Sequence, residues 1–204
     1  MKYNFNINPK IKLANPELAL PNIIQVRGEI SEETAFAFSE AIIAAQNNEQ
    51  EIIPIVIDSF GGDVYAMFSM IDILKTCKVP IATIVCGKVM SAGSVLFSCG
   101  TEGYRYISPN STVMIHHATQ ESDSVGNPHE ARTAADQLEK INEKSLEMLA
   151  ENCGKPKKYF KQLLIKNNHC DLYFTAEEAL KHNIANFIKI PEFNVTVDMK
   201  YKFE

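Results

Sequence analysis

Hydrophobic and polar positions repeat with two different periods along this chain, and each period predicts a different element. Residues 2–8 alternate between apolar and polar side chains, a pattern typical of a half-buried strand. Residues 22–26 read as a short strand that ends at Gly28, and residues 52–57 form a continuous apolar run, as in a strand buried on both faces of a parallel sheet. Further strands are predicted at 79–86, 105–107, 111–117 and 193–203.

Helical spacing separates these strands. Ser31 can cap a helix that reaches about Gln46, since two glutamates follow in its first turn. Thr175 begins a capping box, and Asn183 can end that helix in the left-handed conformation. Further helices are predicted at four places. One carries Met67, Met70, Ile71 and Leu74 on one side, and another begins at Val95–Phe97. A third follows Asn127–Pro128, and a fourth covers residues 157–166.

Repeated alternation of strands and helices predicts an α/β fold. The helix after Pro128 places Ala131, Ala134, Leu138, Ile141 and Met148 on one stripe and ends near Gly154 and Pro156. Its roughly 26 residues would extend about 40 Å, so we expect it to project from a compact domain. No repeat or linker divides the chain, and we expect a single domain over residues 1–204 with an N-terminal segment at 1–21 and an amphipathic strand at 191–204.

Composition narrows the class of protein. With 204 residues, 46% apolar and 22% charged, the chain fits an ordinary soluble domain. The net charge of −5 disfavours a general nucleic-acid surface, and no apolar run reaches the roughly 18 residues of a membrane span. The N-terminus shows no features of a signal peptide. Five cysteines without a CxxC or Cys/His cluster predict no zinc site and reduced, mostly buried thiols, as in a cytosol-like compartment.

The candidate chemistry centres on Ser91, which lies between Gly87 and Gly93 at the end of the apolar run 79–86. A serine at a strand-to-helix turn presents its hydroxyl where backbone N–H groups are free to receive an oxyanion. We therefore interpret Ser91 as a nucleophile. Ser94 is the rival, and we interpret it as a small residue that lets the following helix pack closely.

A hydrolytic serine also needs a base, an acid that orients the base, and oxyanion donors. His116 and His117 lie in a predicted strand, where neighbours face opposite sides, so the period alone leaves open which of them faces Ser91. Gly62 follows a buried strand, and its N–H could join that of Ala92 in a two-donor hole. The remaining histidines and the candidate orienting acids near the turns are His129, His169, His182, Asp58 and Asp63.

Four blocks in series resemble the Clp protease family of serine peptidases, within the Clp/crotonase superfamily, over about residues 22–190. They are Ser59-Phe60-Gly61-Gly62-Asp63-Val64, Gly87-Lys88-Val89-Met90-Ser91-Ala92-Gly93-Ser94, Pro109-Asn110-Ser111-Thr112-Val113-Met114-Ile115-His116 and Asp171-Leu172-Tyr173-Phe174-Thr175-Ala176-Glu177-Glu178-Ala179. The resemblance implies a superhelix of strand–turn–helix repeats with a protruding helix, the handle.

Carried over residue by residue, the resemblance gives each candidate a role. Ser91 matches the nucleophile, His116 the general base and Asp171 the acid that orients it, so the match favours His116 over His117. Gly62 and Ala92 match the oxyanion-hole donors. No metal or organic cofactor is implied.

The chain departs from the family pattern at several places. Phe60 replaces the proline of the Ser-Pro-Gly-Gly turn, and His117-Ala118 replaces Gln-Pro after the catalytic histidine. Residues 120–126 replace a glycine-rich segment that forms the handle strand in the family. Cys170 replaces a basic residue that pairs across rings, and the N-terminal segment lacks the usual pattern of the axial loop that meets an ATPase.

The resemblance implies a cytoplasmic serine endopeptidase that acts through an acyl-enzyme. It implies a homo-oligomer of heptameric rings, which the handle can stack, and an AAA+ ATPase that feeds unfolded polypeptide, with no nucleic-acid or membrane partner. The alternatives are a phage-type maturation protease of the same superfamily, a crotonase-like acyl-CoA enzyme, and a non-catalytic ring subunit. The last would lack a triad residue, whereas the acyl-CoA enzyme would need no Ser–His–Asp set.

Overall fold

A computed structural model describes residues 22–48, 50–119 and 127–192 of the chain. Strands and helices alternate along it, as the apolar periods predict. In chain order the elements are β1 (Ile24–Ile30), α1 (Glu32–Asn47), β2 (Ile53–Gly62), α2 (Val64–Leu74), β3 (Ile81–Met90), α3 (Ala92–Ser98), β4 (Arg105–Ile107), β5 (Thr112–Ile115), α4 (Pro128–Asn152), α5 (Tyr159–Lys166), β6 (Leu172–Phe174), α6 (Ala176–Lys181) and β7 (Phe187–Ile188).

The seven strands form one sheet that forks at β3. Strands β1, β2, β3, β4 and β7 follow one another in parallel. The first half of β3 pairs with β4, whereas its second half pairs in parallel with β5, with Met90 opposite Met114. Strand β6 then runs antiparallel to β5. The fork lies at Gly87, whose N–H donates to Ser111 Oγ at 2.9 Å.

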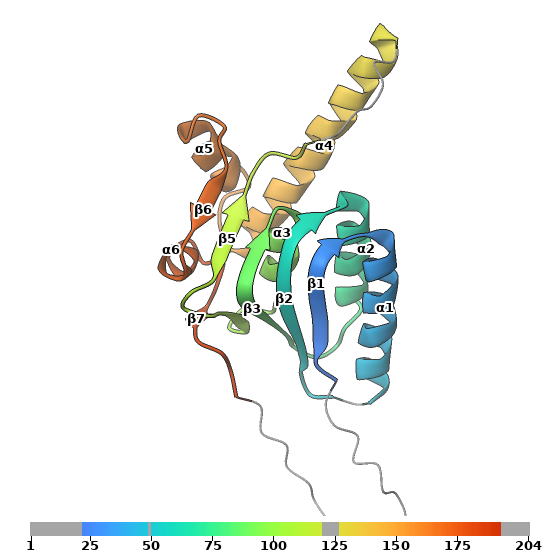
Figure 1. Ribbon diagram of the computed structural model, residues 1–204, viewed down its shortest axis with the longest axis vertical. Helices are drawn as coiled ribbons and strands as arrows, with labels where there is room; N and C mark the ends of the chain where they lie inside the picture. The colour runs from blue at the N-terminus through green and yellow to red at the C-terminus, as the bar shows by residue number, and fades with distance from the viewer. Residues whose placement is uncertain (1–21, 49, 120–126, 193–204) are drawn as a thin grey trace, which may run out of the picture.

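Helices α1, α2 and α3 lie against one face of the sheet, as Figure 1 shows. Their fully buried side chains, among them Ile42, Met67 and Leu96, meet Ile55 and Ile57 of β2 in one core cluster. This arrangement of a parallel sheet with packed helices confirms the predicted α/β class.

Several strand ends differ from the prediction. Strands β2 and β3 continue to Gly62 and Met90, beyond the ends at 57 and 86 that the apolar runs predicted, because ladder hydrogen bonds depend on the backbone rather than on side-chain apolarity. Strand β5 stops at Ile115, so the prediction that His116 and His117 lie within it is wrong. The short strands β6 and β7 were not predicted.

The predicted helices are confirmed, with small shifts at their ends. Ser31, Asn127 and Thr175 each complete a capping box, and Asn183 has a φ of 59°, the left-handed conformation expected after α6. Helix α5 begins at Tyr159, two residues later than expected.

Helix α4 has 25 residues and extends well beyond the sheet, as its amphipathic length predicts. Only its C-terminal half is anchored, through buried Leu146, Leu149 and Ala150. Ala131 and Ala134, which the apolar stripe assigns to packing, are exposed in the projecting half. The C-terminal end of α4 is therefore fixed in the core, and its N-terminal half projects from the sheet.

Some expectations concern residues outside the described ranges. The predicted strands at 2–8 and 193–203 and the departure at 120–126 lie there.

Among the described helices, none has both the length and the apolarity needed to cross a bilayer. All five cysteines are free, but only Cys153 is fully buried and Cys170 is exposed, so the expectation of mostly buried thiols is wrong.

Candidate active site

The candidate residues converge where three parallel strands end. Gly62 closes β2, Ser91 follows β3 and His116 follows β5, and carboxyl ends of parallel strands meet at one edge of a sheet. Strand β6 runs the opposite way, and Leu172 pairs with Ile115. Asp171 precedes Leu172 and His116 follows Ile115, so the antiparallel register brings Asp171 and His116 side by side.

Ser91 occupies a sharp turn between β3 and α3. Its φ of 54° and ψ of −125° are unusual for a residue with a side chain, and such conformations persist only where the surrounding structure enforces them. Its N–H donates to Met114 O at 3.0 Å, and its carbonyl accepts from Ser94 N–H at 3.0 Å. The turn is thus tied to β5 on one side and to α3 on the other.

His116 contacts the hydroxyl of Ser91 directly. The distance from His116 Nε2 to Ser91 Oγ is 2.7 Å, and the imidazole side chain is 23% exposed. When Nε2 accepts the hydroxyl proton, the second ring nitrogen carries a proton and is free to interact with a carboxylate. The pair therefore has the geometry of a nucleophile and its base.

Asp171 lies on the far side of the same imidazole. Its Oδ1 is 3.9 Å from His116 Nδ1, which exceeds hydrogen-bonding distance but lies within the range of an ion pair once the imidazole is protonated. The Asp171 side chain is 48% exposed. Catalytic contacts are often long in the free enzyme and shorten with substrate bound, so this spacing permits an orienting role.

One pocket of about 460 Å³ opens beside the Ser91 hydroxyl, and Gly62, Ala92 and His116 line it together with Ser91. Ala92 is the first residue of α3, where backbone N–H groups have no partner within the helix. A methyl group added at Gly62 would lie 2.2 Å from Ile30 O, so only glycine allows this approach of β2 to β1. The two predicted oxyanion donors therefore border the same space as the Ser91 hydroxyl.

The rival residues have other partners. Ser94 is fully buried, and its hydroxyl lies 2.7 Å from Met114 O and 3.0 Å from Val89 O, so it fastens α3 to the sheet. Asp63 caps α2 by accepting from Ala66 N–H at 2.7 Å. Asp58 pairs with Lys88 at 2.9 Å, a contact that holds the pKa of its carboxyl below the usual value. His117 faces away from Ser91, toward His169 and Asn142.

Helix α4 contributes a wall of the pocket, a role that the sequence analysis did not assign to it. Leu138 and Ile141 line the space above Ser91. Gln137 Nε2 donates to Tyr65 Oη at 3.0 Å and so links α4 to α2 across the mouth. The apolar stripe of α4 could have suggested this role, because its apolar positions continue along the helix beyond the part that the core buries.

The geometry suits acyl transfer at a carbonyl carbon. A base touches the hydroxyl, a carboxylate flanks the base, and an apolar pocket can hold a side chain of the substrate beside the reacting atoms. No group of three or more His, Cys, Asp or Glu side chains within the described ranges is arranged to hold a metal ion.

Comparison with known proteins gives consistent results. The family model for Clp protease matches residues 13–190. The chain is 32% identical over 143 residues to an ATP-dependent Clp protease proteolytic subunit of Deinococcus radiodurans, which covers 70% of this chain and 67% of that protein.

Proposed function

The chain belongs to the Clp protease family as a serine-type peptidase, and on this premise we propose that Ser91, His116 and Asp171 hydrolyse peptide bonds through an acyl-enzyme. The observation that carries the proposal is the 2.7 Å contact between His116 Nε2 and Ser91 Oγ. Both residues occupy the positions that the four sequence blocks assign to nucleophile and base.

In the first step His116 Nε2 takes the proton of the Ser91 hydroxyl while Oγ bonds to the peptide carbonyl carbon. The N–H groups of Gly62 and Ala92 stabilise the oxyanion, and one such donor is typically worth about 10²–10³ in turnover. When the C–N bond breaks, His116 returns the proton to the leaving amine. Water then repeats the sequence on the acyl-enzyme and frees Ser91.

Asp171 supports this cycle through His116. Its carboxylate favours the tautomer with the proton on Nδ1 and stabilises the imidazolium that forms in each transition state. Replacement by asparagine removes the charge and reverses the preferred tautomer, so we expect Asp171→Asn to lower kcat by about 10⁴-fold.

Family membership also supports a proposal about the assembly of subunits. We infer a ring-shaped homo-oligomer of seven subunits whose sites face an enclosed space, with stacking through α4. Folded proteins could not enter such a space, so an AAA+ ATPase would have to deliver unfolded polypeptide. The departures at Cys170, at 120–126 and in the N-terminal segment are the places where stacking and ATPase docking would differ from the family pattern.

Cleavage of a fluorogenic peptide tests the proposal. Ser91→Ala should lower kcat by about 10⁶-fold if the three side chains act as a unit. A serine-reactive phosphonate should label Ser91, and Ser94→Ala should leave that labelling intact because Ser94 points into the sheet. Labelling of another residue would overturn the assignment, and CoA-thioester turnover that survives Ser91→Ala would instead favour a crotonase-like enzyme.

A further inference from the structure

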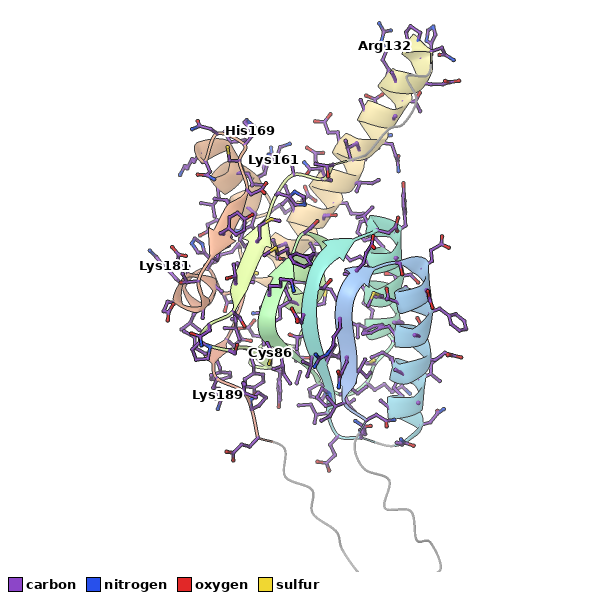
Figure 2. The ribbon with its side chains drawn as sticks, viewed as in Figure 1. Cys86, Arg132, Lys161, His169, Lys181 and Lys189 are labelled. Carbon is purple, nitrogen blue, oxygen red and sulfur yellow. The ribbon has the colours of Figure 1, made fainter. Side chains whose placement is uncertain are left out.

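A short chain of side-chain hydrogen bonds lies immediately beside the catalytic residues. Asn142 of α4 is 3.2 Å from His117 through Nδ2 and Nδ1, and His117 Nε2 is 3.1 Å from His169 Nδ1. The two imidazole rings are 5.2 Å apart between centroids. Figure 2 shows His169 on the turn between α5 and β6. The contacts therefore join three separate segments: α4, the exit of β5 and the entry to β6.

The direction of each hydrogen bond follows from its neighbours. Asn142 Oδ1 accepts from Ala118 N–H at 2.9 Å, so the NH₂ group of Asn142 points at His117 Nδ1. That nitrogen must accept, which places the proton of a neutral His117 on Nε2. His117 Nε2–H then donates to His169 Nδ1. Because a proton occupies the nitrogen nearest His169, the pair is arranged as a donor and an acceptor rather than as two metal ligands.

Both histidines are close in sequence to a residue of the proposed triad. His117 follows His116 directly, and His169 precedes Asp171 by two residues. Backbone hydrogen bonds tie the turn that carries Asp171 to α5, since His169 N–H donates to Leu164 O at 2.8 Å and Asn168 N–H donates to Ile165 O at 3.1 Å. Asn168 and His169 both have left-handed backbones, and the Asp171 side chain is half exposed. Asn167 Nδ2 donates to the carbonyls of Cys170 and Asp171, but these contacts stay within the turn.

Asp171 directly follows this turn, so movement of the turn would change its 3.9 Å separation from His116, the longest link in the proposed triad. We propose that the hydrogen bond from His117 to His169, itself oriented by Asn142, holds the Asp171 turn against the end of β5. His117 and His169 are thus positioning residues that act through Asp171. This inference rests on the proposed function of Ser91, His116 and Asp171.

Two substitutions of His169 separate the effect of its side chain from the effect of its backbone conformation. Glycine and asparagine both tolerate the left-handed conformation, where φ is 61°. Asparagine retains an acceptor oxygen near the position of Nδ1, whereas glycine has none. His169→Gly should lower kcat roughly 2- to 12-fold, the effect of one net hydrogen bond, and His169→Asn should restore most of it. KM should not change, because neither histidine lines the pocket.

The decisive comparison repeats His169→Gly in the full-length chain carrying Asp171→Asn. A residue that acts only by positioning Asp171 has nothing left to position there, so kcat of the double variant should equal that of Asp171→Asn. Thermal unfolding of each variant, followed by circular dichroism, should show that all remain folded at the assay temperature.

Three results would overturn the inference. His169→Gly could leave kcat unchanged, it could lower kcat equally in the Asp171→Asn background, or it could raise KM alone. The proposed function fails differently. If Ser91→Ala retains activity, the nucleophile is wrong whatever His169 does, and if Asp171→Asn alone has no effect, the role of Asp171 is wrong and the positioning role falls with it.

Discussion

The backbone conformation of Ser91 positions its side chain for the proposed role. A non-glycine residue with φ of 54° costs of order 1–3 kcal/mol unless its surroundings compensate, and here Met114 O and the first turn of α3 supply the compensating hydrogen bonds. The same conformation directs Oγ toward His116 and leaves the N–H of Ala92 at the start of the helix. Geometry and strain therefore have one origin, the turn between β3 and α3.

His182 offers a test of stability against pH that is separate from catalysis. Burial, and to a smaller extent Lys155 and Lys181, lower the pKa of His182 below its usual 6.5. The unfolded chain then binds a proton more readily than the folded chain does. Stability should be highest above pH 6.5 and should fall as the pH drops through 6.5 toward the lowered folded pKa.

His182→Asn provides the matched variant for this test. Tyr159 Oη–H lies 2.8 Å from His182 Nδ1, and an asparagine oxygen can accept the same hydrogen bond without titrating. Urea denaturation at pH 7.5 and 5.5 should show a smaller loss of unfolding free energy in His182→Asn than in the parent chain. An equal loss in both would contradict the assignment to His182.

At the residue level the sequence identified candidate residues, but not the contacts that they make. Ser91 and Gly62 could be recognised from glycine-flanked turns, but periodicity left His116 and His117 undecided. The structure explains why, since β5 ends at Ile115 and both histidines lie beyond any alternation. The Asn142–His117–His169 contacts were not foreseen because they join α4, β5 and β6, which are far apart in sequence.

Among the elements, the end of β2 and the Ser91 turn depend on each other at Gly61. This residue has φ of +96°, and a methyl group on it would lie 2.7 Å from Met90 O and 2.8 Å from Ser91 Cβ. Gly61→Ala should therefore displace Ser91, the proposed nucleophile. Since a shift of about 1 Å can cost about 10² in rate, we expect at least that loss in kcat in a peptide-cleavage assay.

Gly103 is the matched control for backbone strain. Its φ of +83° is as unfavourable for alanine, but no atom lies within 4 Å of the added methyl group. Gly103→Ala should lower the free energy of unfolding by about as much as backbone strain alone does in Gly61→Ala. Its kcat should stay within about twofold of the parent value, since Gly103 lies away from the Ser91 turn. Equal loss of activity in the two variants would show that strain, rather than contact with Ser91, decides the effect.

Helix α4 should be sensitive to mutation at one end only. Leu149 is fully buried in the anchored half and also lines the pocket, so Leu149→Ala should reduce unfolding free energy by about 2–5 kcal/mol. Arg132 is exposed in the projecting half, as Figure 2 shows, and Arg132→Ala should change it by less than about 0.5 kcal/mol. Urea denaturation of both variants measures the difference, and similar losses would mean that the projecting half is also packed.

Element types were predictable from the sequence, whereas several element ends were not. Long apolar periods and caps such as Ser31 and Thr175 fixed the helices, because these signals are local. Strands β2 and β3 run on through glycines since a neighbouring strand continues the ladder. Strands β6 and β7 are too short to show a period, and they form because β5 and β4 present free edges.

For the molecule as a whole, the proposed ring predicts an assembly of several subunits. Phe36, Phe60 and Tyr173 are each more than half exposed, although they lie on three different elements. Single exposed apolar side chains are ordinary on a protein surface, so they do not by themselves show an interface. The proposed ring makes the test direct, because native mass spectrometry should give seven or fourteen times the chain mass of 22.8 kDa.

The alternating segment at 193–203 makes a sharper prediction about this assembly. Its apolar positions, among them Phe193, Val195 and Val197, alternate strictly with polar ones such as Asn194 and Thr196. A strand-like pattern with one apolar side needs a partner surface, which a neighbouring subunit can provide. Truncation after Glu192 should therefore reduce the mass of the assembly in native mass spectrometry.

Substitutions within the full-length chain separate the apolar side of this segment from its length. Val197→Lys places a charge on the apolar side of the alternation, whereas Thr196→Lys places the same charge on the polar side. If the segment joins subunits, Val197→Lys should lower the assembly mass as truncation does, because burying an unpaired charge is unfavourable, and Thr196→Lys should leave it unchanged. An unchanged mass after truncation would mean that the segment pairs within its own subunit, and equal effects of both lysines would mean that charge alone disturbs the assembly.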